Sequence, residues 1–465
     1  MLCIFQLAGC ATTGDRDFLT IHYQRNAQVE GPDRNPVLVV PGLLGSTLRD
    51  TGSDELIWGG FDGVSVNPER PDGLRALALP FNAAADGRVN DDDGVEPTWV
   101  LERAKVRLLG LPFNLNVYAG ILQALGAGGY RDESLGTAGV IDYGPGHFTC
   151  FQFPYDWRRD IVESAQKLHA YIEDRARYVE QEYAARFGGT ETPVRFDIVA
   201  HSMGGLVVRY YLMYGAQDLP ADGSLPALTW AGAKRVERAV LVATPNAGST
   251  ATISNLLNGL SLGFLQPTYS ATLLGTYPST YQLMPRAGAN AAVWADTDEP
   301  IDDLLSPELW AENGWGLAAP TADEELRILL PDLSSEKTRR HAALALQRRL
   351  LRRAAQFQRA MDQPAAMPDG LSLLLVVGDN RRTAKQVAIA RAPAAAEVVQ
   401  FGDGDGTVLR ASVLHDQRNE SDWQPTLRTP LDYDHALFLP DTHKGLTDNP
   451  TFTDNILYWL LEDPR

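Results

Sequence analysis

The segment 194–214 limits the fold of this chain more than any other part of the sequence. It begins with an apolar, β-branched run typical of a buried strand, and it ends as an apolar stretch of helical character. One short turn, which contains Ser202, separates the two. Strand and helix approach closely at such a turn, so its neighbours must be small, as Ala200, Gly204 and Gly205 are. The pattern predicts that Ser202 is lifted out of a sheet on a sharp turn with strained backbone.

Other parts of the chain repeat this alternation of strand and helix. Buried strands are predicted at 34–40, 194–200, 236–243 and 371–377, and helices at 117–125, 163–187, 204–214 and 451–461. Helices that alternate with buried strands favour a mostly parallel sheet covered on both faces. The predicted fold class is therefore α/β.

Ser202 is a candidate nucleophile, and a serine hydroxyl needs a base that is oriented by a carboxylate. In α/β-hydrolases these groups follow in the order Ser, Asp, His, so both are expected C-terminal to Ser202. The segment 402–408, GDGDGTV, supplies the acid. We choose Asp405, because it directly precedes a strand-like Gly-Thr-Val run that would fix its position, and keep Asp403 as the alternative. An EF-hand calcium loop is excluded, because Leu414 stands where the bidentate glutamate is needed.

The histidine is expected on the segment 432–437, DYDHAL, which is interpreted as a loop before the last helix. We choose His435, with His443, eight residues further along, as the second choice. His201 adjoins the candidate nucleophile in the sequence but points elsewhere on a strand-to-helix turn, so its predicted role is packing.

An oxyanion intermediate needs two backbone N–H donors, one from the residue after the nucleophile and one from the loop after an early strand. Met203 and Leu43 occupy those places, and Leu43 lies in the glycine-containing loop 41–46, PGLLGS. With the nucleophile, acid and base in the expected order, these residues make an α/β-hydrolase the predicted fold.

The predicted organisation is one large fold with insertions. It comprises a candidate lipoprotein signal and tether at 1–30, a first core part at 31–245 with an irregular insertion at 49–117, a mainly helical cap at 246–370 and a second core part at 371–465. The cap contains a long, arginine-rich helix at 335–361. We interpret it as an ordinary solvated cap helix, because runs of charge usually face solvent, and contact with anionic lipid is the alternative.

The N-terminal residues 7–10, LAGC, resemble the cleavage site of a bacterial lipoprotein signal. This reading makes Cys10 the lipidated residue and predicts a lipid-anchored protein of the cell envelope. A chance occurrence of the four letters is the alternative.

Composition excludes several classes of function. The 41 basic and 59 acidic residues give a formal net charge of −18, which disfavours nucleic acid as a partner. Three cysteines cannot form a disulfide framework, and no pair has the spacing of zinc ligands. No cofactor and no metal are therefore predicted.

The ordered motifs resemble the lecithin:cholesterol acyltransferase family, which includes phospholipases and phospholipid:diacylglycerol acyltransferases. The matching blocks are VLVVPGLLGSTL at 37–48, GYRDES at 129–134, FPYDWRRD at 153–160, IVAHSMGGLVVRYYL at 198–212, ATPNAGS at 243–249, PSTYQLMP at 278–285, GDGDGTV at 402–408 and DHALFL at 434–439. The resemblance implies a catalytic triad of Ser202, Asp405 and His435, with Leu43 and Met203 as oxyanion donors.

The chain departs from the family in two ways. Ala200 replaces the first glycine of the usual elbow, and no cysteine lies between Cys10 and Cys150 to close the membrane-binding loop that animal members staple with a disulfide. Trp58 and Phe61 fall in the corresponding region and are candidates for lipid contact, with simple packing as the alternative.

The specific motif Asp156-Trp157-Arg158 lies near the active site in the family. We favour a structural role over substrate contact for these residues, because an arginine and a carboxylate beside an aromatic ring can lock a loop as a buried ion pair.

The predicted function is serine-dependent acyl hydrolysis or acyl transfer on ester lipids through an acyl-enzyme, with peripheral membrane contact. The same triad serves hydrolysis and transfer. The alternatives are a carboxylesterase for small esters and a catalytically silent, lipid-tethered binding protein that keeps the fold.

Overall fold

The computed structural model describes residues 25–29, 31–60, 66–81, 92–101, 103–108, 111–116, 118–135, 147–190, 192–261, 267–391, 393–418 and 424–464. Cys10, the predicted lipidation site, and Phe61 lie outside these residues.

The centre of the protein is a six-stranded sheet in which every neighbouring pair of strands is parallel. Its strands, in spatial order, are β16 (His435–Leu439), β13 (Ser372–Gly378), β9 (Val236–Val242), β8 (Phe196–His201), β1 (Val37–Val40) and β7 (Cys150–Gln152). The predicted α/β-hydrolase fold, with its mostly parallel sheet, is confirmed.

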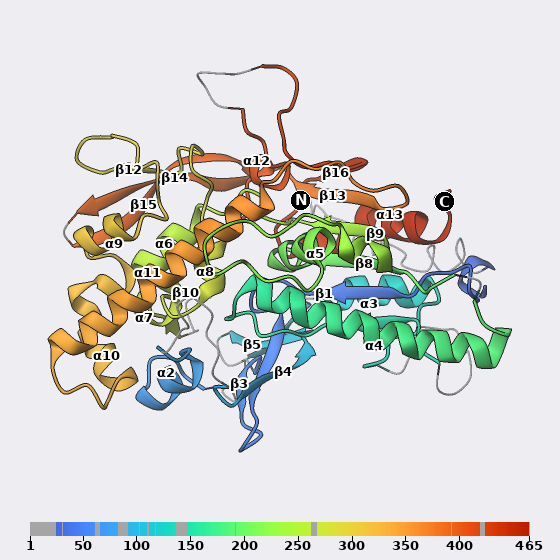
Figure 1. Ribbon diagram of the computed structural model, residues 1–465, viewed down its shortest axis with the longest axis horizontal. Helices are drawn as coiled ribbons and strands as arrows, with labels where there is room; N and C mark the ends of the chain where they lie inside the picture. The colour runs from blue at the N-terminus through green and yellow to red at the C-terminus, as the bar shows by residue number, and fades with distance from the viewer. Residues whose placement is uncertain are drawn as a thin grey trace, which may run out of the picture.

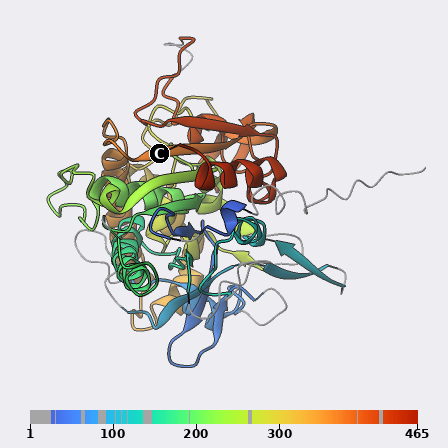
Figure 2. The ribbon, with the colours of Figure 1, turned by 90° about the vertical axis from the view of Figure 1, so that its right-hand side faces the viewer.

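Successive side chains of each strand point to opposite faces, and each face is covered by helices. In β1, Val37 and Val39 join the core formed with α3 (Ala119–Ala127) and α13 (Pro450–Leu461). Leu38 and Val40 join the core that contains α4 (Ile161–Phe187) and α5 (Met203–Tyr214). Figure 2 shows α4, in green, and α13, in red, on opposite sides of the sheet.

Short helices and one long helix form most of the segment predicted as a cap, and they gather to the left of the central sheet in Figure 1. They are α6 (Ala251–Asn258), α7 (Ala271–Leu274), α8 (Pro278–Gln282), α9 (Pro307–Asn313), α10 (Asp323–Leu329) and α11 (Glu336–Met361), with the 3-10 turns η2 (Gly316–Ala318) and η3 (Pro320–Ala322) and the short strands β10 (Leu260–Ser261), β11 (Thr268–Tyr269) and β12 (Ala292–Trp294).

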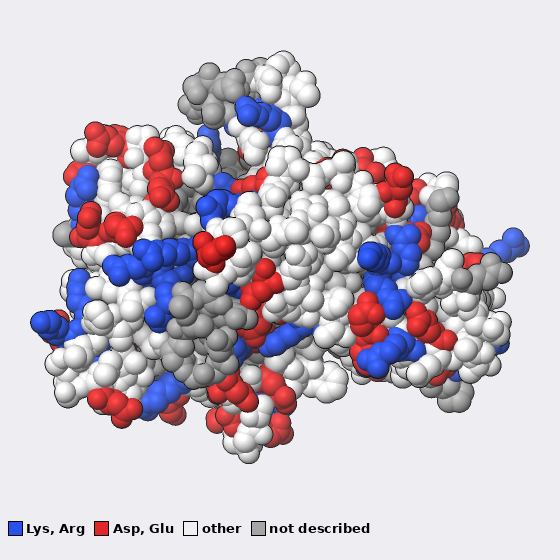
Figure 3. Space-filling view, viewed as in Figure 1, with Lys and Arg blue, Asp and Glu red and all other residues white. Residues whose placement is uncertain are grey.

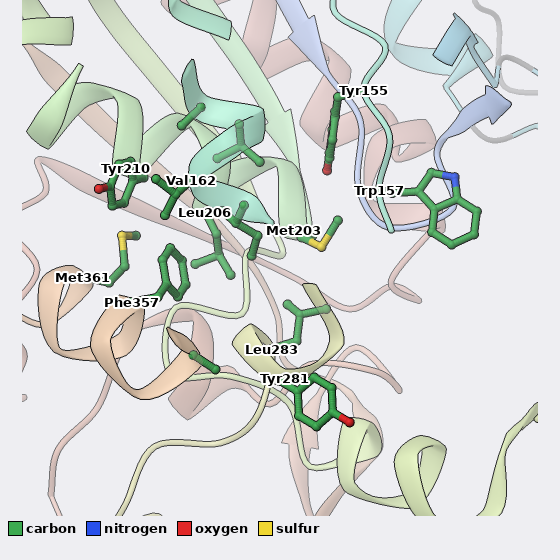
Figure 4. Close-up of a cluster of buried hydrophobic side chains, with 14 of the residues drawn as sticks. Tyr155, Trp157, Val162, Met203, Leu206, Tyr210, Tyr281, Leu283, Phe357 and Met361 are labelled. Atoms are coloured by element: carbon green, nitrogen blue, oxygen red, sulfur yellow. The ribbon is translucent and has the colours of Figure 1, made fainter. Parts of the chain in front are cut away.

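The long helix α11 ties this segment to the core through apolar and ionic contacts. Figure 4 shows Leu206 and Tyr210 of α5 beside Phe357 and Met361 of α11, and the rings of Tyr210 and Phe357 stack with centroids 6.1 Å apart. Arg353, also on α11, is buried and forms an ion pair with Asp160, the N-cap of α4. Part of the arginine run in α11 therefore serves the packing of the helix.

Two regions contain more strand than the sequence predicts. The insertion at 49–117 holds β2 (Ser46–Asp50), β3 (Leu56–Trp58), α2 (Pro71–Leu77), β4 (Val95–Val100), β5 (Arg103–Leu108) and β6 (Leu111–Asn116). The segment after β13 forms the long hairpin β14 (Arg381–Arg391) and β15 (Ala394–Gly404). These strands lie outside the central sheet, and most of them lack the continuous β-branched run of a strand that is buried on both faces.

The remaining elements are the short helices α12 (Arg410–Val413), η1 (Ala231–Arg235) and η4 (Gly445–Asp448). Among the residues that the structure describes, no helix combines the length and the apolar character needed to cross a bilayer.

Candidate active site

Ser202 stands between β8 and α5 in a conformation that L-residues avoid. Its φ of 54° and ψ of −127° are strained, a state that costs on the order of 1–3 kcal/mol. The Ser202 N–H donates a hydrogen bond to the Val242 carbonyl at the end of β9, 2.8 Å away, which helps to hold the turn. The predicted sharp turn is present.

Small residues around Ser202 allow the turn to pack against the loop after β1. A Cβ atom on Gly204 would lie 2.3 Å from the Pro41 carbonyl oxygen, and one on Gly42 would lie 2.7 Å from Ser202 Cβ. Both contacts are too close for any side chain. Ala200 is fully buried in β8, so the alanine that replaces the usual glycine is accommodated.

A series of hydrogen bonds joins Ser202 to a histidine and an aspartate. Ser202 Oγ lies 2.9 Å from His443 Nε2, and His443 Nδ1 lies 2.7 Å from Asp405 Oδ2. Asp405 is buried and the His443 side chain is 13% exposed, so the series runs from the protein interior toward solvent. The structure thus brings Ser202 and Asp405 together, as predicted, but with His443.

The choice of His435 is corrected by its place in the sheet. His435 is the first residue of β16 and pairs with Leu374 of β13, so it stands at the amino-terminal end of a parallel strand and is exposed. Ser202 follows the carboxyl end of β8, and the carboxyl ends of these parallel strands lie on the opposite side of the sheet from their amino ends. His443 follows the carboxyl end of β16 and therefore reaches Ser202, which His435 cannot.

Asp405 is held by backbone amides, and the strand-like run that was expected to fix it is absent. Its Oδ1 accepts hydrogen bonds from the N–H groups of Thr407 (2.9 Å) and Val408 (2.7 Å). Burial alone would raise the Asp405 pKa, but the hydrogen bond and charge of His443, with these amides, hold the pKa below its usual value. The alternative, Asp403, is exposed on β15 opposite Arg382 of β14.

The loop after β1 brings Leu43 to the same site. Gly45 N–H donates to the Gly42 carbonyl, and Leu44 has a φ of 62°, so the chain makes a tight turn with Leu43 at its corner. Within the described residues, the backbone N–H groups of Leu43 and Met203 have no hydrogen-bond acceptor. Both predicted oxyanion donors therefore have an N–H group available for a ligand.

Side chains of the motif at 153–160 hold the loop after β1 by hydrogen bonds to its backbone. Tyr155 donates its hydroxyl hydrogen bond to the Pro41 carbonyl (2.9 Å), and Trp157 Nε1 donates to the Ser46 carbonyl (3.2 Å). Trp58, proposed above as a lipid contact, is 4% exposed and packs edge-on against Trp157, so that interpretation is wrong for Trp58.

Asp156 and Arg158 form a buried ion pair that closes the same motif. Arg158 donates to both carboxylate oxygens of Asp156, at 2.9 and 2.7 Å, and reaches Asp93 at 2.7 Å. Burial would raise the Asp156 pKa, but the charges and hydrogen bonds of Arg158 and Arg159 hold it below its usual value. These contacts favour a structural role for the motif.

Two residues that the sequence did not single out as polar contacts adjoin the site. Tyr118, which directly precedes α3, was not identified, and His201 was assigned to packing. The Tyr118 hydroxyl lies 3.0 Å from His201 Nδ1, and His201 Nε2 lies 2.9 Å from the His443 carbonyl oxygen. Nothing in the local sequence pairs Tyr118 with His201, because they are 83 residues apart.

Buried histidines predict that the protein loses stability in acid. Burial lowers the pKa of His201 to about 3 and that of His415 to about 2, whereas the pKa of histidine in an unfolded chain is about 6.5. Between these values only the unfolded state binds the protons, so the free energy of unfolding falls as the pH drops from about 6.5 toward 3. Urea denaturation at pH 7 and pH 4.5 measures the loss.

His201→Gln is expected to show a smaller loss between the two pH values, and His341→Gln, on an exposed position of α11, is the control. Equal losses in wild type and His201→Gln would contradict the assignment of acid sensitivity to His201.

Comparisons with known proteins relate part of this chain to one protein family. Residues 114–313 match the family model of lecithin:cholesterol acyltransferase. The chain is similar to that family over this segment. It is 24% identical to lecithin-cholesterol acyltransferase-like 4 of Arabidopsis thaliana over 280 residues, which are 54% of this chain and 43% of the plant protein. The match thus spans less than half of that relative's length, and the predicted family resemblance is confirmed at this level.

One solved structure is similar to this chain over nearly the whole length of both chains. The crystal structure of the Tle4–Tli4 complex is similar with a TM-score of 0.52, covers 92% of this chain and 98% of that chain, and is 14% identical in sequence. At this identity the likeness supports the α/β-hydrolase fold alone.

Proposed function

We propose that this protein is a serine-dependent acyl hydrolase or acyltransferase of ester lipids. The observation that carries the proposal is the hydrogen-bonded series of Ser202, His443 and Asp405 beside the available N–H groups of Leu43 and Met203. A serine hydroxyl, an imidazole oriented by a carboxylate and two convergent amide donors are the parts that acyl transfer through an oxyanion requires.

In the proposed first half-reaction, His443 Nε2 removes the hydroxyl proton of Ser202 as Oγ attacks the ester carbonyl carbon. The N–H groups of Leu43 and Met203 donate to the developing oxyanion, and the ionised Asp405 stabilises the charge that His443 gains. The protonated His443 then delivers its proton to the leaving alkoxide, and the acyl group stays on Ser202.

In the second half-reaction, His443 deprotonates either water or an alcohol, which attacks the acyl-enzyme. Water yields a free fatty acid and an alcohol yields a new ester, and both restore Ser202 with its proton. The ester-lipid substrate class is inferred from the family relationship.

Product analysis tests the proposal. Wild type and Ser202→Ala are incubated with phosphatidylcholine vesicles that contain a long-chain alcohol, and the lipids are analysed by mass spectrometry. We expect wild type to release fatty acid or to form a fatty alkyl ester, with at least a roughly 10³-fold lower rate in Ser202→Ala, as loss of a catalytic nucleophile predicts.

The outcomes of this experiment separate the rival functions. Cleavage of a soluble short-chain ester without any change in the lipids would indicate a carboxylesterase of small esters. Absence of every serine-dependent product from folded wild type would indicate a silent binding protein.

We also propose that the exposed arginines of α11 contact the surface of anionic membranes. Arg352 and Arg359 are exposed and line a groove of about 730 Å³ with the loops 220–223 and 303–306 and the start of α9. Figure 3 shows Lys and Arg side chains gathered over α11, on a protein whose formal net charge is −18. A local basic patch on an acidic protein directs it toward anionic lipid through that face.

Sedimentation with vesicles tests this contact. Arg352→Glu/Arg359→Glu is expected to lower binding to phosphatidylglycerol-containing vesicles at least about tenfold, because each basic residue near such a surface contributes roughly 1 kcal/mol. Arg340→Glu/Arg348→Glu changes the net charge equally on α11 outside the groove lining and is the matched control. Equal loss of binding in both double variants would overturn the assignment to this face.

A further inference from the structure

A buried tyrosine and a buried histidine link the loop after β1 to the histidine of the site. Gly42 N–H donates to the Tyr118 hydroxyl over 2.7 Å, the Tyr118 hydroxyl lies 3.0 Å from His201 Nδ1, and His201 Nε2 lies 2.9 Å from the His443 carbonyl oxygen. Tyr118 is 2% exposed and His201 is 8% exposed, so water does not compete for these bonds.

The two ends of this series fix the direction of every hydrogen bond in it. The Gly42 amide can only donate, and the His443 carbonyl can only accept. His201 Nε2 therefore carries a proton, and the bare Nδ1 of the neutral ring accepts the hydroxyl proton of Tyr118. Burial lowers the His201 pKa to about 3, which keeps the ring neutral at ordinary pH.

Each end of the series lies next to an atom that the reaction would use. Gly42 precedes Leu43, and a Cβ on Gly42 would lie 2.7 Å from Ser202 Cβ. The hydrogen bond of the Gly42 amide therefore holds the oxyanion loop against the nucleophile. At the other end, the His443 N–H donates to the Asp405 carbonyl at 2.9 Å. His201 holds the carbonyl of the same residue, so both backbone polar groups of His443 are fixed.

We propose that Tyr118 and His201 act as positioning residues, which together set the oxyanion loop and His443 in register with Ser202. This inference rests on the proposed function and deepens it. The pair adds no reacting group, but it fixes the distances between the oxyanion loop, His443 and Ser202. The residues on either side of His443, Thr442 and Lys444, are exposed, so His201 is a principal interior contact of this loop.

The kinetic test uses Tyr118→Phe, which breaks both hydrogen bonds of the hydroxyl, and Tyr281→Phe as matched control. Tyr281 is also fully buried and loses one hydroxyl bond, to the Gly275 carbonyl at 3.0 Å. Active sites are titrated with a fluorophosphonate, so that misfolded protein does not count. We expect kcat per titrated site to fall at least about tenfold in Tyr118→Phe with KM within about twofold, since small misplacements of reacting groups cost rate.

Histidine variants separate positioning from packing. The amide nitrogen of His201→Gln can replace Nε2 as donor to the His443 carbonyl, whereas His201→Ala offers no donor. We expect kcat per titrated site to be at least about threefold higher in His201→Gln than in His201→Ala, because the restored donor orients His443 again. Equal kcat per site in Tyr118→Phe, Tyr281→Phe and wild type would overturn the proposal.

A spectroscopic readout tests the pair without relying on catalysis. In wild type labelled with ¹⁵N-histidine, and assigned with His201→Gln, the His201 ring should show a bare Nδ1 and a protonated Nε2 from pH 8 to pH 5. A proton on Nδ1 would overturn the proposed series. If wild type shows no serine-dependent turnover, the proposed function fails, and this measurement still decides whether the hydrogen-bonded link exists.

Discussion

Replacing His443 with alanine is expected to lower kcat for ester hydrolysis at least about 10³-fold, because the Ser202 hydroxyl loses its only base in hydrogen-bond range among the described residues. Replacing His435 with alanine is expected to leave kcat within about twofold, since an exposed side chain at the amino end of β16 is remote from the reacting atoms. Initial rates on a soluble ester, divided by the concentration of folded protein, measure both effects.

The pair His443→Ala and His435→Ala is a matched comparison, because the two histidines lie eight residues apart in one segment of the chain. A large loss of kcat in His435→Ala with little change in His443→Ala would contradict the geometry. It would restore the assignment that the sequence pattern favours.

Replacing Gly204 with alanine is expected to destabilise the protein by at least about 3 kcal/mol, the upper range for overpacking a close contact. The new Cβ would lie 2.3 Å from the Pro41 carbonyl oxygen and 2.8 Å from the Val40 carbonyl oxygen, and neither backbone atom can rotate away. Helix propensity alone predicts the opposite sign, because alanine within a helix is favoured over glycine by roughly 1 kcal/mol. Urea denaturation monitored by tryptophan fluorescence measures the difference.

Gly52→Ala is the control for this substitution. Its nearest neighbour would be Asp50 Oδ1 at 3.4 Å, an ordinary contact distance, and we expect a change within about 0.5 kcal/mol. Stabilisation of the protein by Gly204→Ala would contradict the close packing of the elbow against the loop after β1.

The sequence predicted the centre of the site well because its parts are local. The elbow around Ser202 and the Pro41–Gly42 loop each consist of a buried strand followed by small residues, and both patterns can be read within about ten residues. Asp405 was selected because a strand-like run was expected after it. That run is absent, and two backbone amides hold the carboxylate instead. The long helices were also predicted nearly to their ends, since α4 and α11 each carry a clear apolar stripe.

The choice between the two histidines failed because the segment around His435 was interpreted as a loop. The run His-Ala-Leu-Phe-Leu is the edge strand β16, and Pro440 and Asp441 end it. Residues of this kind of site follow the carboxyl ends of parallel strands, so a strand prediction for 435–439 would have selected His443. That one element changes which histidine reaches Ser202.

Contacts between distant parts of the chain could not be predicted from the sequence. Tyr118 and His201 form their hydrogen bond only when α3 packs against the sheet that contains β8. Tyr155 donates to the Pro41 carbonyl across 114 residues of sequence. The hairpin of β14 and β15 was missed for another reason. Its strands are only partly buried, so they lack the apolar runs by which the central strands were recognised.

Covalent labelling tests most directly whether Ser202 is the nucleophile. Wild type, Ser202→Ala and His443→Ala are treated with a long-chain fluorophosphonate, digested and analysed by peptide mass spectrometry. We predict one adduct, on Ser202 of wild type, with a labelling rate in His443→Ala lower by at least about 10²-fold, as loss of the general base requires. Folded wild type that remains unlabelled, or an adduct that persists in Ser202→Ala, would contradict the central claim that Ser202 is the nucleophile.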